Sequence, residues 1–254
     1  MSDVSRRLTV LADGEPFAPD CRLRLSGKTA VGLFPSLFTL EIRNLSEEDL
    51  FRLNEAGNLT VMRGDSCLAH GRISDAFRRT VPEGTLTAAA FSFGLDLWKA
   101  PVSLSLGAGV SVSETVLRLL NASGTGIQLL SFPGSDPVFS RAQAYCGRAA
   151  ECVEAALSAV QARAYLVPAG LCVIPADPLP ATLHLSEADL TDRPAFAEGG
   201  RKMILSTTVT GFQPGEEMTL NLGGRAWSGL ILERLTEADT AAGPWMTQLL
   251  IDLH

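Results

Sequence analysis

A pattern of strands and turns that occurs twice is the feature that most constrains how this chain can fold. The first copy spans residues 59–93 and the second spans residues 218–252, with matching points 158 or 159 residues apart. Apolar and polar residues alternate in the opening run of each copy, which is typical of half-buried strands. Gly64 in the first copy and Gly223 and Gly224 in the second stand where a tight turn needs a positive φ. A repeat of this length predicts a duplicated domain rather than a solenoid of short units.

The size and composition indicate an ordered protein with more than one core. A chain of 254 residues and 27.0 kDa has room for two or three small domains. Its hydrophobic content of 46% and mean hydropathy of +0.18 are typical of a globular fold. The first residues lack the apolar core of a signal peptide, and no apolar run approaches the ~18 residues of a membrane helix. We therefore expect neither passage through a translocon nor membrane insertion.

Charge and cysteine content argue against a nucleic-acid-binding protein and against a protein stabilised by disulfides. The formal net charge of -7 and the pI near 5.0 argue against a nucleic-acid-binding protein, whose affinity comes from clustered lysine and arginine. The cysteines are odd in number and scattered, and a chain of this size does not need disulfides to stabilise its core. We expect reduced, buried side chains at Cys21, Cys67, Cys146, Cys152 and Cys172.

The first third of the chain predicts an antiparallel barrel interrupted by one helix. Strands are expected at residues 8–11, at 21–25 and, with strict alternation, at 38–43. Ser46 has the spacing of a helix cap before the acidic residues that follow it, which favours a short helix there. With the first copy of the repeat, these elements predict a domain over residues 1–98.

A change of pattern after residue 98 predicts a small α/β domain over residues 99–178. A strand at 102–106 precedes a helix that starts at Ser111 or Ser113. A second helix is expected over residues 149–160, where apolar residues fall on one stripe, and a hairpin follows it.

The last segment, residues 179–254, returns to the strand pattern of the first. Strands are expected at 182–185 and at 203–212, and a turn at 213–216 leads into the second copy of the repeat. The sequence as a whole therefore predicts a mixed α+β, β-rich fold: two antiparallel β-barrel domains with a small α/β domain between them.

This order of domains resembles that of the baseplate hub proteins of tailed bacteriophages, including the Mu-like hub and the matching domain of type VI secretion spike proteins. The residues that carry the resemblance are 59–73, the helix GVSVSETVLRLL at 109–120, and the run MILSTTVTGFQPGEEMTLN at 203–221 with its turn at Pro214 and Gly215. The resemblance covers most of the chain as a pattern of elements, and the chain is shorter than many hubs.

The resemblance implies a structural, non-enzymatic role in a virion. Both barrels would be like tail-tube subunits, and a homotrimer would form a pseudo-sixfold ring joining a hexameric tail tube to a trimeric spike. The implied partners are the tail tube protein, the central spike protein, and other baseplate and tape-measure proteins. DNA would only pass through, and an acidic lumen would repel it. The implied location is the tail baseplate, after assembly in the host cytoplasm.

Two short patterns resemble parts of known ligand-binding motifs, but both are incomplete. Gly107 and Gly109 lie between a strand and a helix, as in a dinucleotide-binding turn, but Val112 replaces the third glycine and no acidic residue follows at about 20 positions. Cys67 and His70 have the spacing of half a zinc site, without a second pair to complete it. We interpret the first as a tight strand-to-helix turn and the second as a strand cysteine beside a surface histidine.

Acidic clusters are equally weak as catalytic or metal signals. Glu187, Asp189 and Asp192 lack the alternation and glycine of a calcium loop. The acids at 47–49 suit the start of a helix without any role as glycosidase carboxylates. We therefore assign no catalytic residue, no cofactor and no metal ligand. Two alternative functions stay open from the sequence: a tail-tip cell-wall hydrolase, and a β-rich host-recognition module.

Overall fold

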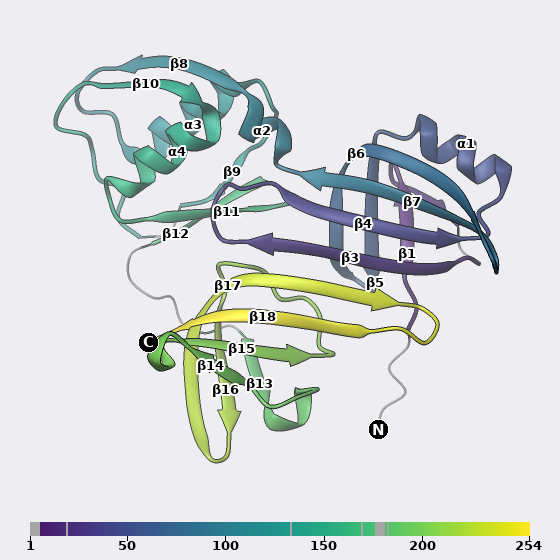
Figure 1. The fold of residues 1–254 in the computed structure, drawn as a ribbon. Coiled ribbons are helices and arrows are strands. Elements are labelled where there is room, and N and C mark those ends of the chain that lie inside the picture. Colours follow the sequence, from purple (N-terminus) through teal and green to yellow (C-terminus); the bar gives the residue numbers. More distant parts are fainter. Residues whose placement is uncertain (1–5, 19, 133, 169, 176–180, 182) are drawn as a thin grey trace.

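The computed structural model describes residues 6–18, 20–132, 134–168, 170–175, 181 and 183–254 (Figure 1). Within these residues, a 13-stranded sheet dominates the molecule and is accompanied by a two-stranded and a three-stranded sheet. The chain is β-rich, with large antiparallel sheets and few helices, as the sequence predicts.

The large sheet has two halves that come from the two ends of the chain. The first half contains β1 (Thr9–Ala12), β2 (Glu15–Phe17), β3 (Arg22–Ala30), β4 (Ser36–Arg43), β5 (Asn58–Arg63), β6 (Ser66–Val81) and β7 (Gly84–Phe93). The second half contains β13 (Leu183–Ser186), β14 (Ala195–Ala197), β15 (Lys202–Thr207), β16 (Glu217–Leu222), β17 (Arg225–Asp239) and β18 (Trp245–Leu253). Pairing of β17 with β3 joins the halves. Figure 1 shows them as a purple and blue upper layer and a green and yellow lower layer.

The middle of the chain forms a separate α/β unit beside the sheet (Figure 1). Its elements are α2 (Leu95–Lys99), β8 (Pro101–Leu106), α3 (Val112–Ser123), β9 (Leu129–Ser131), β10 (Gln143–Arg148), α4 (Ala149–Ser158), β11 (Arg163–Val167) and β12 (Gly170–Ile174). Helices α3 and α4 pack on each other and on β8, β10 and β11. The remaining helix α1 (Glu47–Glu55) belongs to the first half, and the one-turn helices η1 (Glu187–Asp189) and η2 (Glu198–Gly200) belong to the second.

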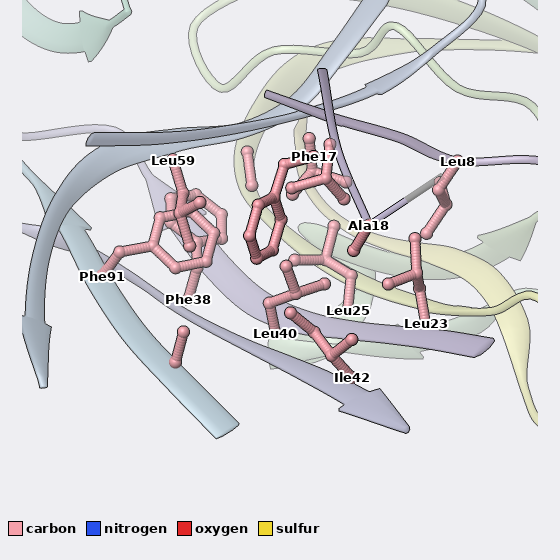
Figure 2. Close-up of a cluster of buried hydrophobic side chains, with 14 of the residues drawn as sticks. Leu8, Phe17, Ala18, Leu23, Leu25, Phe38, Leu40, Ile42, Leu59 and Phe91 are labelled. Carbon is pink, nitrogen blue, oxygen red and sulfur yellow. The ribbon is translucent and has the colours of Figure 1, made fainter. Parts of the chain in front are cut away.

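Three hydrophobic clusters are centred in these three parts, and the first also contains Ala238 and Trp245 of the second half. The cluster in the first half contains Phe38 and Phe91, whose rings stack with centroids 5.3 Å apart, above fully buried Leu40 and Ile42 (Figure 2). The alternating run in β4 therefore points its apolar residues into this core, as the sequence predicts. A second cluster fills the α/β unit, and a third lies under the second half of the sheet.

The helix boundaries follow the predicted capping residues. The Ser46 hydroxyl accepts a hydrogen bond of 3.0 Å from the Asp49 backbone N–H at the start of α1. Ser111, not Ser113, caps α3, because its hydroxyl accepts a bond of 3.2 Å from the Glu114 N–H. Gly124 then ends α3 with a φ of 66°.

Some predicted boundaries are wrong. The strand expected over 203–212 ends at Thr207, because the Thr207 hydroxyl accepts a 3.1 Å bond from the Val209 N–H and donates one to the Asp189 carbonyl. The predicted strand at 182–185 is present from Leu183 to Ser186, and its first residue lies outside the described residues. The helix expected to reach residue 160 ends at Ser158.

Candidate assembly surface

The two longest strands of the sheet, β6 and β17, match in the hairpin that precedes each and in the strand that follows each. Each follows a hairpin turn at the predicted position: β5 pairs with β6 across Gly64, and β16 pairs with β17 across Gly223 and Gly224. Each then pairs along its length with the next strand, β7 or β18. The repeat seen in the sequence is therefore present in three dimensions.

The match between β6 and β17 extends to single residues. A β-bulge interrupts the β6–β7 register at Ser74, and another interrupts the β17–β18 register at Leu232, 158 positions later. Just beyond the hairpin, the Ile73 N–H donates to the Gly57 carbonyl at 2.9 Å, and the Ile231 N–H donates to a carbonyl at 3.0 Å in the same way. A bulge reorients a strand at a fixed point, so both strands turn away from their hairpin partners at equivalent residues.

Two equivalent glycines, Gly71 and Gly229, each allow the backbone of the neighbouring strand to come close. A Cβ atom at Gly71 would lie 2.4 Å from the carbonyl oxygen of Ser92, and a Cβ at Gly229 would lie 2.4 Å from that of Asp252. Neither glycine has a positive φ, so the reason for glycine is space and not backbone conformation.

The junction between the halves lies on the outer edge of β17, beyond its bulge. Residues 233–239 of β17 pair with residues 24–30 of β3. Ion pairs reinforce the ladder: Lys28 lies 2.7 Å from Glu233, and Arg22 lies 2.9 Å from Asp239. Burial would raise the pKa of Asp239, but hydrogen bonds from Arg22 and from the Ala241 N–H hold this pKa below its ordinary value. The junction is therefore held by both backbone and charge.

Arg234 is a buried cation at the centre of this junction. Its guanidinium donates to the carbonyl oxygens of Phe212 and of Leu68, each at 2.8 Å, and the residue is 4% exposed. Burial lowers the pKa of Arg234 to about 10, so the group stays protonated at neutral pH. One side chain of the second half thereby binds backbone of both halves.

The corresponding edge of β6 is open. Beyond Arg72, the described residues contain no strand paired with the outer edge of β6, which bonds to β7 on its other side. Phe77 lies on this segment and is 53% exposed, whereas its equivalent in β17, Leu235, is partly covered beside β3. The short strand β14 also has one unpaired edge, because it ends the order of strands. Exposed strand edges are surfaces on which other strands can pair.

A cavity of about 440 Å³ lies beside the junction, between the sheet and α4. Most charged groups in its wall are already engaged by the chain. Glu154 accepts a 3.0 Å bond from the Leu33 N–H, Glu233 pairs with Lys28, and Lys202 pairs with Glu198. These charged groups of the cavity wall are therefore held by partners within the chain.

The glycine pattern considered for nucleotide binding forms the turn between β8 and α3. Gly109 has a φ of 85°, and its N–H donates to the Phe139 carbonyl at 2.8 Å. At the start of α3 the carboxylate of Asp136 accepts bonds from the Ser113 N–H and hydroxyl. The chain therefore supplies its own anion at this helix N-terminus.

The half zinc pattern lies on β6 without forming a cluster. The His70 ring bonds through Nδ1 to the Thr60 hydroxyl at 2.8 Å, and the Cys67 thiol lies 3.6 Å from the Ala69 carbonyl. Burial lowers the pKa of His70 and raises that of Cys67, so both are neutral at pH 7. Among the described residues, no three His, Cys, Asp or Glu side chains gather as a metal site would require.

The five cysteines are free, but the prediction that all are buried is wrong. Only Cys152 is buried, Cys146 is exposed, and the other three are intermediate. Strand β10 carries Cys146 on the outward side of its two-stranded pairing with β8. Its thiol is accessible to solvent.

The acidic clusters are engaged in local structure. Asp189 caps η1 by accepting a 2.8 Å bond from the Ser186 N–H, and Asp192 accepts a 2.7 Å bond from the next N–H in the chain. Glu187 is exposed on η1. In the acids at 47–49, Glu47 pairs with Arg78 of β6. In the described part of the chain, no helix has the length and apolar character to span a membrane.

Comparison with known proteins identifies the fold. A tail protein from Neisseria meningitidis MC58 has a TM-score of 0.68 at 12% identity, with 96% of this chain and 95% of that chain covered. The fold is that of phage tail proteins. The 43 kDa tail protein of prophage MuSo2 from Shewanella oneidensis matches with a TM-score of 0.65 at 12% identity, with 97% of each chain covered.

A third similar structure comes from a secretion system. The E. coli c3393 protein is described as a component of the type VI secretion system with structural similarity to the T4 tail proteins gp27 and gp5. It matches with a TM-score of 0.69 at 10% identity, covering 98% of this chain and 77% of that chain. No family model and no curated protein matches by sequence. The resemblance to tail hubs is thus confirmed at the level of fold.

The structure adds features that the sequence did not single out: the bulges, buried Arg234, and the exposed Phe77 on an open edge. For Phe77 the sequence did offer a signal, because the 158-residue offset between the two copies aligns Phe77 with Leu235. Nothing in the sequence signals that β3 covers one of these two positions and leaves the other open.

Proposed function

We propose that this protein is the structural baseplate hub of a phage tail or a related injection machine, and that it acts without catalysis. The observation that carries the proposal is the residue-level match between β6 and β17 in a chain with the fold of phage tail proteins. Two equivalent units in one chain allow three chains to present six equivalent surfaces. A ring of that kind can meet a hexameric tube on one side and a trimeric spike on the other.

In this proposal each half of the large sheet is a tube-protein-like antiparallel barrel. The boundaries are those expected from the sequence: 1–98 for the first barrel, 99–178 for the α/β domain and 179–254 for the second barrel. Three hydrophobic clusters, one centred in each part, support the division, and the first also takes in Ala238 and Trp245 of the second barrel. Pairing of β17 with β3 within each chain fixes one barrel against the other. The spacing of two neighbouring units in the ring is therefore built into each chain.

The ring would also be a conduit. A net charge of -7 per chain disfavours binding of DNA phosphates and so favours passage. The proposed partners are two further copies of the chain, the tail tube protein, the central spike protein, and neighbouring baseplate and tape-measure proteins. The site of action would be the tail of the virion, after assembly in the host cytoplasm. A ring lined by lysine and arginine would contradict the conduit.

The solution mass tests the hub directly. Light scattering at several concentrations is expected to give about 81 kDa, three times the 27.0 kDa of one chain. Negative-stain averages of the same fraction are expected to show a pore with six similar lobes. A chain that stays at 27.0 kDa at every concentration, alone and with tube and spike proteins, would refute the hub and leave a monomeric binding module.

A further inference from the structure

The open edge of β6 is the equivalent of an edge that the same chain covers in its second half. In β17 the edge beyond the bulge pairs with β3, whereas in β6 it pairs with nothing among the described residues. If the two halves are equivalent units of a ring, the strand that covers β6 must be the equivalent of β3. This inference rests on the proposed hub, and it identifies the surface through which copies of the chain would close the ring.

The equivalent of β3 in the second half can be identified by following rows of paired residues across the sheet. In the first half, Lys28 of β3 lies opposite Leu37 of β4, which lies opposite Ser92 of β7. In the glycine contacts, Ser92 corresponds to Asp252 of β18. The row that ends at Asp252 therefore corresponds to the row that contains Lys28.

In the second half, that row leads to β14. Asp252 lies opposite Lys202 of β15, and Lys202 lies opposite Ala197 of β14. Ala197 is therefore the equivalent of Lys28, and β14 is the equivalent of β3. The outer edge of β14 is unpaired in the described chain, as that of β3 would be without β17.

We propose that β14 of one copy pairs in antiparallel fashion with the open edge of β6 in a second copy. The register comes from the junction within the chain, where Leu235 lies opposite Lys28. Phe77 is the equivalent of Leu235, so it lies opposite Ala197 of the second copy. Arg79 then lies opposite Ala195 of that copy, two residues further along the ladder.

The side chains at this edge suit such a contact. Phe77 is 53% exposed, and the residues that would face it, Ala195 and Ala197, are small enough to let its ring lie over them. Phe196 of β14 is 46% exposed, and its ring packs at a tilt against that of Trp227, with centroids 5.0 Å apart, so β14 presents a supported apolar surface. Burying both rings would add a hydrophobic contribution to the backbone pairing.

One chain cannot make this contact with itself. Figure 1 shows β6 in the upper layer at one side of the molecule and β14 in the lower layer at the other. The contact is therefore head-to-tail between copies, and such contacts close into rings when the rotation allows it. Pairing of two β6 edges with each other is the main competing arrangement, and it would leave β14 open.

Cysteine cross-linking tests the register. Directly opposite residues in an antiparallel pair have Cα atoms about 4.5–5.5 Å apart, within the range of a disulfide. In a chain carrying Cys146→Ser to remove the exposed thiol, Phe77→Cys with Ala197→Cys is expected to shift the oxidised, non-reduced band from 27.0 to about 81 kDa. The matched control, Phe77→Cys with Ala195→Cys, joins diagonal positions about 7–8 Å apart and is expected to give little product.

A second variant tests the contact without a disulfide. Phe77→Asp is expected to shift the mass in solution from about 81 to 27.0 kDa with the circular dichroism spectrum unchanged, because the side chain is exposed in the single chain. Leu117→Asp is the control, since Leu117 is an exposed apolar residue on α3, outside the sheet.

The outcomes separate this inference from the proposed hub. A trimer by light scattering that does not cross-link through Phe77→Cys and Ala197→Cys overturns the pairing and leaves the hub in place. Dimers from Phe77→Cys alone would show β6 paired with β6 and would also overturn it. A ladder of products beyond three chains supports the pairing and refutes the closed trimer. A monomer without any cross-link counts against both.

Discussion

Gly71 and Gly229 offer the sharpest test of the equivalence of the two halves. Replacing either by alanine places a methyl group 2.4 Å from a carbonyl oxygen of the neighbouring strand, where normal contact needs more than 3.0 Å. In both cases the obstacle is backbone inside a paired sheet, so it cannot rotate away as a side chain would. Each substitution must therefore separate the strands locally or break hydrogen bonds between them.

The expected cost is similar at the two sites. Overpacking a well-packed region costs about 1–3 kcal/mol. For a chain of this size, each kcal/mol lowers the melting temperature by about 2–4 °C. Gly71→Ala and Gly229→Ala are each expected to fall in this range. Gly229→Ala should lie at the upper end, because its methyl group also meets the Ile251 side chain at 2.7 Å.

Thermal unfolding followed by tryptophan fluorescence and circular dichroism measures both effects. The control is Gly107→Ala, which has ordinary φ and open space around its Cβ position, and which should be neutral or stabilise by about 0.4–1 kcal/mol. If Gly71→Ala and Gly229→Ala unfold at the wild-type temperature, the close approach is not required, and the argument for equivalent halves loses one of its supports.

Two further predictions concern the junction. Arg234→Met leaves the buried carbonyls of Phe212 and Leu68 without their donor and is expected to lower the free energy of unfolding by about 2–4 kcal/mol in urea titrations; an unchanged value would mean that these bonds are not needed. Because the folded pKa of Asp239 is lowered from 3.8, its carboxylate bound to Arg22 stabilises the fold above that pH and loses this effect as the pH falls through the folded value. Asp239→Asn should therefore be less stable than wild type at pH 7 and should converge with it in acid, and a pH-independent difference would contradict the assignment.

The sequence predicted those parts of the fold that depend on local pattern. The alternation in β4 predicted both its strand and its buried face, Ser46 predicted the start of α1, and the choice of Ser111 or Ser113 predicted the start of α3 to within two residues. The repeat predicted the hairpins, because a glycine turn between two alternating runs is a local signal. Each of these features is determined by residues that lie close together in the sequence.

The features that were missed depend on distant partners. Strand β14 has three residues, too few for a period, and is a strand only because it pairs with β15. Arg234 follows Glu233 in the strand, where nothing local indicates burial, and its two carbonyl partners belong to Phe212 and to Leu68, the latter 166 residues away. Helix α2 has five residues, and its Leu97 is buried in the core of the α/β unit. Such elements are specified by tertiary packing more than by their own sequence.

The two junctions of the proposed ring are unequal, and this sets an order of events. Within the chain, seven residues of β3, 24–30, pair with β17, with two ion pairs and the buried bonds of Arg234. Between chains, β14 offers three residues, and Pro194 before it has no N–H to extend the ladder. A short edge strand next to proline also limits pairing with unrelated strands. The chain is therefore expected to fold first and the ring to close afterwards. Phe77→Asp should abolish the ring at a temperature where the chain is still folded, whereas Arg234→Met should lower the temperature at which the chain itself unfolds.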